Sequence, residues 1–189
     1  TAAGILAIAG HPDAPAGFVH DLYRETIYAA LGPARRVELH DRVASALLRR
    51  HERGSPVFPV ELAYHFTAAI LRAGTQPAVT WAHSAARADA TRFAFSEAAG
   101  HLARLRSAVA TAGLQLSDTD LVGVLTAEAD LRLRSGDAVQ ARELLDTAWT
   151  QAVASGRAEL LGTVALGLDR IGARFAMPRA HLVGVLSKA

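Results

Sequence analysis

The chain has 189 residues, of which 51% are hydrophobic and 6% aromatic, and its formal net charge is +2. With 20 basic and 18 acidic side chains it lacks the strong positive field of a polyanion-binding domain, and without cysteine it cannot form disulfides, thiolate metal sites or a cysteine nucleophile. No apolar run approaches the roughly 18 residues that a membrane span needs, so we expect a soluble, cytoplasmic protein with no membrane partner.

The N-terminal segment predicts a short hairpin followed by a helix. Apolar residues at 4–8 and 17–19 flank the Pro- and Gly-rich stretch GHPDAPAG, which is typical of two strands joined by a long loop. A helix is expected at 21–31, because Asp21 is a favourable N-cap residue and a Gly-Pro pair follows the last turn. The chain begins with Thr1 rather than Met, so we expect it to be a piece of a longer protein.

Two further helices are expected at 34–50 and 60–73, separated by the linker RGSPVFP. The stretch AGTQP at 73–77 is expected to end the second one, since Gly and Pro interrupt helices. The helices at 21–31 and 34–50 also resemble a helix-turn-helix. Its arginines could contact phosphates: Arg35, Arg36, Arg42, Arg49, Arg50 and Arg53. The acidic residues between them are Glu38, Asp41 and Glu52. Such mixed charge favours a solvated, salt-bridged surface.

Beyond Pro77 the sequence is rich in alanine, and helix-length segments alternate with short turns. The expected helices are 78–92, 95–112, 118–134, 137–154, 157–175 and 179–188. The clearest turn is at Gly136 and Asp137, because Gly suits the end of a helix and Asp suits the N-cap of the next. This pattern predicts a series of helical hairpins.

An internal repeat accompanies these hairpins. Small and large apolar residues recur at the same spacing 43 positions apart: Ala86, Ala98, Leu102 and Leu105, then Ala129, Ala141, Leu145 and Ala148. The pattern resembles the tetratricopeptide repeat over units 79–112 and 122–155, although Leu105 stands where Ala is expected. A third unit, 157–188, matches loosely. Because one hairpin cannot bury its apolar stripe alone, we predict an α-solenoid over 76–189.

No residue pattern predicts a catalytic or metal site. The sequence has neither HExxH nor G-x-S-x-G, and Glu61 and His65, four residues apart, are too few for zinc. The one lysine is Lys188, so a P-loop for nucleotide phosphates cannot form here. The aromatic residues that could line a ligand groove, or simply belong to the core, are Trp81, Trp149, Phe93, Phe95 and Phe175. We therefore predict that this chain is not itself an enzyme.

Three stretches, FVHDLYRETIYAAL, RRVELHDRVASAL and ELAYHFTAA, carry a family resemblance. Together with the Ala-rich hairpins they resemble the signal-transduction ATPases with numerous domains, especially the large ATP-binding LuxR-type transcriptional regulators. The matching positions are Phe18, His20, Leu22, Arg24, Glu25, Tyr28, Leu31, Arg36, Leu39, His40, Leu47, Ala63 and His65. The resemblance implies a winged-helix-like module at 1–75, preceded by a domain that binds ATP or ADP and followed by a tetratricopeptide-like array at 76–189.

The stretch VHDLYRETI is similar to the Met-His-Asp motif that closes the winged-helix domain of related switch ATPases. The resemblance implies that His20 senses nucleotide by reaching the β-phosphate of bound ADP, and that Asp21 occupies the aspartate position of the motif. Val19 replaces the methionine. An imidazole N–H can donate to a phosphate, so exchange of ADP for ATP could bias an equilibrium between two domain arrangements.

These observations together predict a mostly α protein with a short N-terminal β-hairpin, a winged-helix-like module and a tetratricopeptide-like α-solenoid. We expect it to couple nucleotide state to the array. Its partners would be the nucleotide-binding domain of the same chain and a small-molecule inducer or protein partner, with no direct nucleic acid contact. Two alternatives stay open: a stand-alone tetratricopeptide scaffold for protein partners, and a helix-turn-helix DNA-binding protein.

Overall fold

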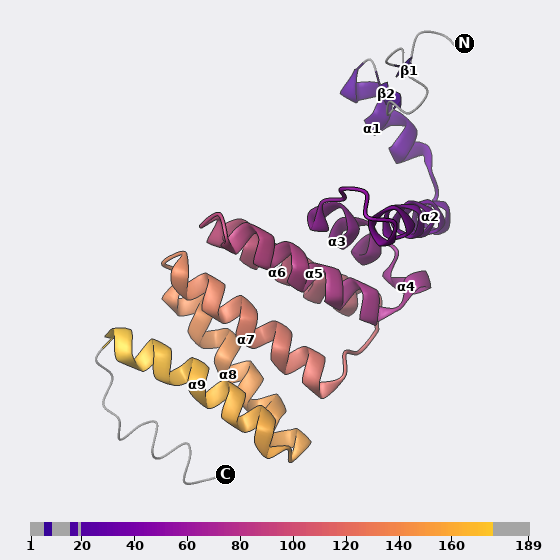
Figure 1. Ribbon diagram of the computed structural model, residues 1–189. Helices are drawn as coiled ribbons and strands as arrows, with labels where there is room; N and C mark the ends of the chain where they lie inside the picture. Colours follow the sequence, from indigo (N-terminus) through magenta and orange to yellow (C-terminus); the bar gives the residue numbers. More distant parts are fainter. Residues whose placement is uncertain (1–5, 9–15, 19, 176–189) are drawn as a thin grey trace.

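The computed structural model describes residues 6–8, 16–18 and 20–175, and the described part is almost entirely helical, as the sequence predicted. Figure 1 shows the helices following one another in chain order, with the later ones stacked side by side. Their bounds are α1 Asp21–Ala30, α2 Pro33–Glu52, α3 Pro59–Ala68, α4 Ile70–Ala73, α5 Thr75–Ala90, α6 Phe95–Thr111, α7 Asp118–Arg134, α8 Ala138–Ser155 and α9 Ala158–Phe175. The predicted helix at 179–188, and with it the end of the third repeat unit, lies outside the described residues.

Two short strands precede α1. β1 (Leu6–Ile8) pairs antiparallel with β2 (Ala16–Phe18), with Leu6 opposite Phe18. β1 covers the described part of the apolar segment at 4–8, and β2 has three residues, as many as the segment at 17–19, but begins one residue earlier. The loop between them falls outside the described residues.

The stretch AGTQP at 73–77 ends a helix as predicted, but the interruption is shorter than expected. The break falls at Gly74, whose φ of 82° is rarely adopted by residues with a side chain, and α5 already begins at Thr75 rather than at 78. Pro77 therefore lies in the first turn of α5, where its missing N–H would have no helical partner in any case. The expected single helix at 60–73 is also divided, because the chain leaves helical geometry at Ala69.

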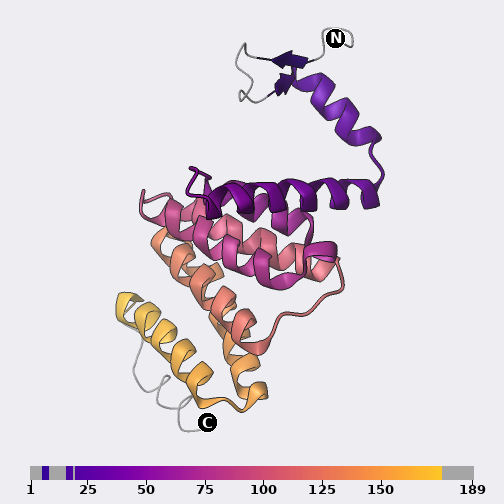
Figure 2. The ribbon, with the colours of Figure 1, turned by 45° about the vertical axis from the view of Figure 1, so that its right-hand side comes forward.

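The first helix stands apart from the rest of the protein. Figure 2 shows α1 projecting from the stack together with the strands. None of its residues is buried, and its large apolar side chains remain exposed, with Leu22 at 71% and Ile27 at 44%. We call this helix, Asp21–Ala30, the arm. It is held at its C-terminal end, where the chain turns into α2.

The helices from α2 onward share a hydrophobic interior in two clusters. The first includes Ala44, Leu62, Phe66, Ala82, Leu102, Leu105 and Val124, and so extends from α2 to α7. The second, from α7 to α9, includes Val122, Leu125, Leu145, Ala148, Leu160 and Val164. Because the first cluster continues across residue 75, α2 and α3 pack on the repeats as additional layers. The division of the chain into 1–75 and 76–189 stays a prediction.

The eight positions of the internal repeat are all buried. The exposed fraction is at most 4% at Ala86, Ala98, Leu102, Leu105, Ala129, Ala141, Leu145 and Ala148. The repeated positions of the hairpins α5–α6 and α7–α8 are thus core positions, the first set in the first cluster and the second set in the second. Small residues at such positions allow paired helices to approach closely.

Candidate functional site

The arm is joined to the helical stack through Tyr28 and Arg36. The Tyr28 hydroxyl lies 3.0 Å from Nε2 of His40 on α2. The Arg36 guanidinium lies 4.7 Å from the centroid of the Tyr28 ring. Arg36 also donates to the backbone oxygens of Leu31 and Ala29, each at 2.9 Å, and so satisfies carbonyls that the end of the arm leaves without helical partners.

His40 is the centre of a cluster that also joins α2 to α3. It is buried, with 7% of its surface exposed, and its Nδ1 lies 2.9 Å from Nδ1 of His65 on α3. The ring of Tyr64 packs edge-on against His40, with the centroids 5.3 Å apart. We call Tyr28, His40, Tyr64 and His65 the junction cluster, since it connects the arm, α2 and α3.

The number of protons on the two histidines determines whether this arrangement is stable. The contact between the Nδ1 atoms of His40 and His65 needs one N–H donor and one acceptor, so a neutral pair satisfies it. One extra proton is compatible, because His40 can then donate to both His65 and Tyr28. A second extra proton would place two N–H donors against each other. The junction cluster is therefore incompatible with two charged histidines.

The environment keeps both imidazoles neutral over a wider pH range than usual. Burial lowers the pKa of His40 below its ordinary value. Burial is also the main reason that the pKa of His65 is lowered; the neighbouring His40 acts in the same direction and Glu61 in the opposite one. The pKa of Tyr64 is raised, first by burial and then by Tyr28, so its hydroxyl stays protonated.

His20 and Asp21 lie at the other end of the arm and are not part of the junction cluster. His20 is exposed at the N-cap of α1, and its side chain makes no capping hydrogen bond. Its ring lies 6.0 Å from that of Tyr23. Asp21 forms an exposed ion pair with Arg24 at 3.4 Å. His20 is thus neither buried nor used as a cap, and its ring nitrogens are accessible to a ligand.

No family model, curated protein or solved structure matches this chain. The resemblance to LuxR-type ATPases therefore rests on the residues themselves. Four of those positions, Tyr28, Arg36, His40 and His65, come together at the junction of α1, α2 and α3. These positions are part of the sequence resemblance, but nothing in the sequence indicates that their side chains are in contact.

The arginines of α2 do not form one free basic surface. Arg35 pairs with Glu38 at 2.7 Å, and Arg36 is engaged with the arm. Asp41 on the same helix pairs with Arg72 of α4 at 2.8 Å. Arg42, Arg49 and Arg50 line a shallow cavity with apolar residues of the exposed side of α2. This mixture of ion pairs and apolar surface gives no support to phosphate binding along α2.

A second polar cluster joins α5 to α6. His101 Nε2 lies 2.8 Å from Asp89 Oδ2, and Arg92 pairs with the other oxygen of the same carboxylate. Nη2 of Arg104 donates to Nδ1 of His101 at 2.8 Å. Burial alone would raise the pKa of Asp89, but the hydrogen bonds from His101 and Arg92 outweigh it and hold the pKa below its ordinary value. No motif or spacing in the sequence singles out any of these four residues.

The Asp89–His101 pair is not arranged for nucleophilic catalysis. Arginine only donates hydrogen bonds, so Nδ1 of His101 is the acceptor and Nε2 carries the proton that is donated to Asp89. A catalytic histidine would present that acceptor nitrogen to a hydroxyl or a water. Here Arg104 occupies it and can take no proton. The pair instead fixes the position of Arg104.

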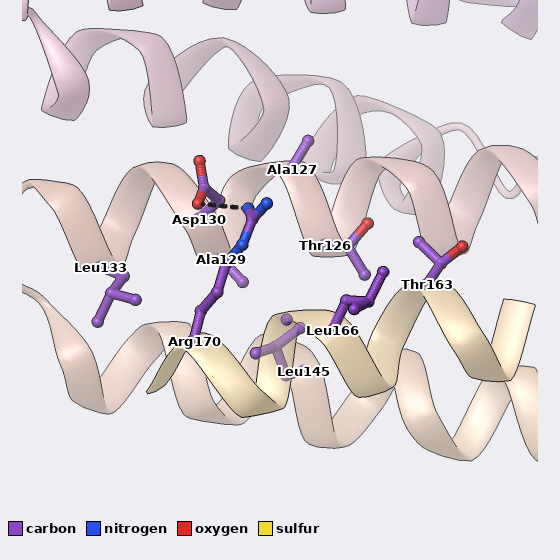
Figure 3. A pocket seen from close by; sticks show the side chains of 10 residues that line it. Thr126, Ala127, Ala129, Asp130, Leu133, Leu145, Thr163, Leu166 and Arg170 are labelled. Atoms are coloured by element: carbon purple, nitrogen blue, oxygen red, sulfur yellow. Dashed lines mark hydrogen bonds and ion pairs between the residues drawn. The ribbon is translucent and has the colours of Figure 1, made fainter. Parts of the chain in front are cut away.

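A cavity of about 350 Å³ lies between α7 and α9. Figure 3 shows Asp130 and Arg170 bridging it, with Leu145 and Leu166 as apolar lining. Asp130 pairs with Arg170 at 3.2 Å and with Arg134 at 2.9 Å. Asp130 is thus shared by two arginines, so the guanidinium of Arg170 at this cavity already has a carboxylate partner.

The aromatic residues do not form one groove. Trp81 packs on the first core cluster and Trp149 on the second, while Phe93 is 81% exposed on the loop after α5. The side chain of Phe175 lies outside the described residues. Within the described part of the chain, no three His, Cys, Asp or Glu residues are placed to hold a metal ion. No described helix combines the length and apolarity of a membrane span.

Proposed function

We propose that this chain is the regulatory part of a multidomain transcriptional regulator. In this proposal, α1 and the strands belong to a winged-helix-like module that follows a nucleotide-binding domain. The hairpins from α5 onward are a tetratricopeptide-like sensor that binds an inducer or a protein partner. The module performs no catalytic step. The observation that supports the proposal best is the projecting arm, with an accessible His20 at its start and the junction cluster at its end.

The attachment of the arm suits a switch. No residue of the arm is buried, so a change in its direction costs little apolar contact. The contacts at its C-terminal end are directional: one hydroxyl–imidazole hydrogen bond and two bonds from Arg36 to carbonyl oxygens. Breaking and remaking a few directional bonds is the kind of local change that allows two discrete arrangements. A domain bound at the start of the arm could therefore alter the surface that α2 and α3 present.

His20 is the residue proposed to respond to nucleotide. Its ring can donate an N–H bond to a phosphate oxygen, and nothing in the described residues occupies its nitrogens. The same bond is absent when the phosphate moves or the domain separates. In this proposal His20 holds the ADP-bound state closed. Loss of the hydrogen bond between His20 and the phosphate would favour the open state.

The test uses the complete protein that carries this segment. Dissociation of a fluorescent ADP analogue is compared in the wild type and in His20→Ala. Loss of a hydrogen bond to a charged phosphate should accelerate release about tenfold or more. His51→Ala, which removes another exposed histidine at the far end of α2, serves as the matched control and should release ADP at the wild-type rate.

Equal release rates in His20→Ala and the wild type would refute nucleotide sensing by the arm. The lack of a P-loop in the coding sequence upstream of His20 would also contradict the proposal and favour the stand-alone scaffold. A DNA titration of the 189-residue chain against salt addresses the third possibility. Binding that weakens steeply with salt would support the DNA-binding alternative.

A further inference from the structure

A second cavity, of about 370 Å³, lies between α3 and α6. Its α3 wall includes Val60, Ala63 and Thr67, and its α6 wall includes His101 and Arg104. Most of the lining is apolar; α3 adds the hydroxyls of Tyr64 and Thr67, while the imidazole and the guanidinium lie on the α6 side. A mostly apolar concavity with a few fixed polar groups is the usual form of a small-molecule site, and this volume is at the lower end of the usual range.

The polar end of this cavity is held in place from inside the protein. Asp89 and His101 are both buried, with 8% and 7% of their surface exposed. Asp89 accepts from His101, and His101 in turn accepts from Arg104. The guanidinium of Arg104 lies back over Gly100: a Cβ placed there would be 3.2 Å from Nη1 of Arg104. The buried hydrogen bonds, together with the lack of a side chain at Gly100, thus fix the position of the exposed Arg104.

The charge at this end of the cavity is not compensated. Asp89 is neutralised by Arg92, and His101 is neutral in the arrangement that its partners require. Among the residues that the structure describes, no carboxylate lies within ion-pair distance of Arg104. One hydrogen bond to His101 leaves the remaining N–H donors of Arg104 available. The cavity between α7 and α9 differs in this respect, because its Arg170 already has Asp130.

We propose that the cavity between α3 and α6 binds a small organic monocarboxylate, with the carboxylate on Arg104 and the apolar body against α3. One uncompensated guanidinium matches one carboxylate, which it can bind through two parallel N–H bonds. A phosphate dianion would leave excess negative charge beside Val60 and Ala63, which cannot solvate it. The small volume favours a free ligand over a partner helix.

This inference does not depend on the proposed regulatory function. It would define the class of inducer if that function holds, and it would define a ligand site if the chain is a simple scaffold. Tyr64 lines the cavity and also packs against His40. A ligand in the cavity would therefore contact the junction cluster directly.

The experiment is a titration of the 189-residue chain followed by calorimetry and by amide NMR shifts. The probes are phenylacetate and hexanoate, each compared with its neutral amide, phenylacetamide and hexanamide. We expect the carboxylates to bind at least about tenfold more tightly than the amides, since the ionic hydrogen bonds are lost in the amides. Saturable shifts should include Thr67, His101 and Arg104.

Three variants test the two parts of the site. Arg104→Gln should abolish the difference between carboxylate and amide, whereas Arg49→Gln, on the exposed side of α2, should keep it. Ala68→Leu, a half-buried position in the cavity wall, should weaken binding of both probes by filling space. NMR spectra of each variant show whether it is folded.

No saturable binding of any carboxylate by the folded wild-type chain would overturn the inference. So would equal affinity for acid and amide, or carboxylate binding that survives Arg104→Gln. Tight binding of acidic peptides but not of the small acids would show that the surface docks a protein instead. None of these measurements involves nucleotide, so their outcome is separate from the ADP-release test of the regulatory function.

Discussion

Replacing two helical glycines by alanine tests how closely α9 packs on α8. A Cβ placed at Gly167 of α9 would lie 2.8 Å from Cδ2 of Leu145 and 3.4 Å from Cδ1. Leu145 is 2% exposed, but it also lines the cavity between α7 and α9, so its methyl groups can relieve part of this contact by moving toward that cavity. A Cβ placed at Gly123 of α7 meets no heavy atom within 4 Å. The two substitutions share the same gain in helix propensity and differ in the steric contact.

The expected magnitudes follow from these two contributions. Gly→Ala in a helix interior stabilises by roughly 0.5–1 kcal/mol, so Gly123→Ala should raise the free energy of unfolding by about that amount. At Gly167 the same gain is opposed by overpacking against Leu145, whose cost should lie at the lower end of the usual range, about 1 kcal/mol, because the leucine borders a cavity. The free energy of unfolding of Gly167→Ala should therefore be about 1 kcal/mol below that of Gly123→Ala.

The assay is urea unfolding followed by circular dichroism, with a double-mutant cycle. Leu145→Val shortens the side chain that the new Cβ would meet. The double variant Gly167→Ala/Leu145→Val should lose less stability than the sum of the single losses, with a coupling of about 0.5 kcal/mol or more. If Gly167→Ala stabilises as much as Gly123→Ala, and the cycle is additive, then α9 does not pack on α8 at this position.

Two further predictions concern the junction cluster. Tyr28→Phe removes the hydroxyl that contacts His40, so hydrogen exchange in the arm should accelerate about fivefold, as a loss of ~1 kcal/mol implies; unchanged exchange would mean that this bond does not hold the arm. His40 and His65 have lowered folded-state pKa values. The unfolded chain therefore binds more protons, and their stabilisation is full above the unfolded pKa of about 6.5 and decreases as pH falls below it. Replacing both histidines by Gln should make the free energy of unfolding depend less on pH between pH 8 and 5. An equal dependence in the variant and the wild type would show that these two histidines do not take up protons on unfolding.

The helices could be predicted from the sequence because their signals are local. Both ends of α7 coincide with the expected 118–134, since Ser117 caps its start and Gly136 permits the turn after its end. The start of α5 was harder to predict. Pro77 reads as a helix breaker in the sequence, but its effect depends on its position within the helix, and that position follows from where Gly74 ends α4.

The junction cluster could not be predicted in the same way. His40 and Tyr28 are 12 residues apart, and His40 and His65 are 25 apart. The residues of each pair lie on different helices, so no spacing rule within one element links these side chains. Their contact depends on how α2 crosses α3 and on where the arm turns. Asp89 and His101 show the same limitation, because they face each other across the loop between α5 and α6.

Tyr64 connects the two proposals physically. It lines the cavity between α3 and α6, and its ring packs against His40, which holds the arm through Tyr28. If a carboxylate moves Tyr64 on binding, the arm equilibrium must change, and by reciprocity a change in the arm must alter carboxylate affinity by the same factor. The contact is one edge-on pair of rings, worth roughly 0.5–1.5 kcal/mol. Coupling through this contact alone is therefore limited to about tenfold, so a larger effect of ligand on ADP release would require a second route between the cavity and the arm.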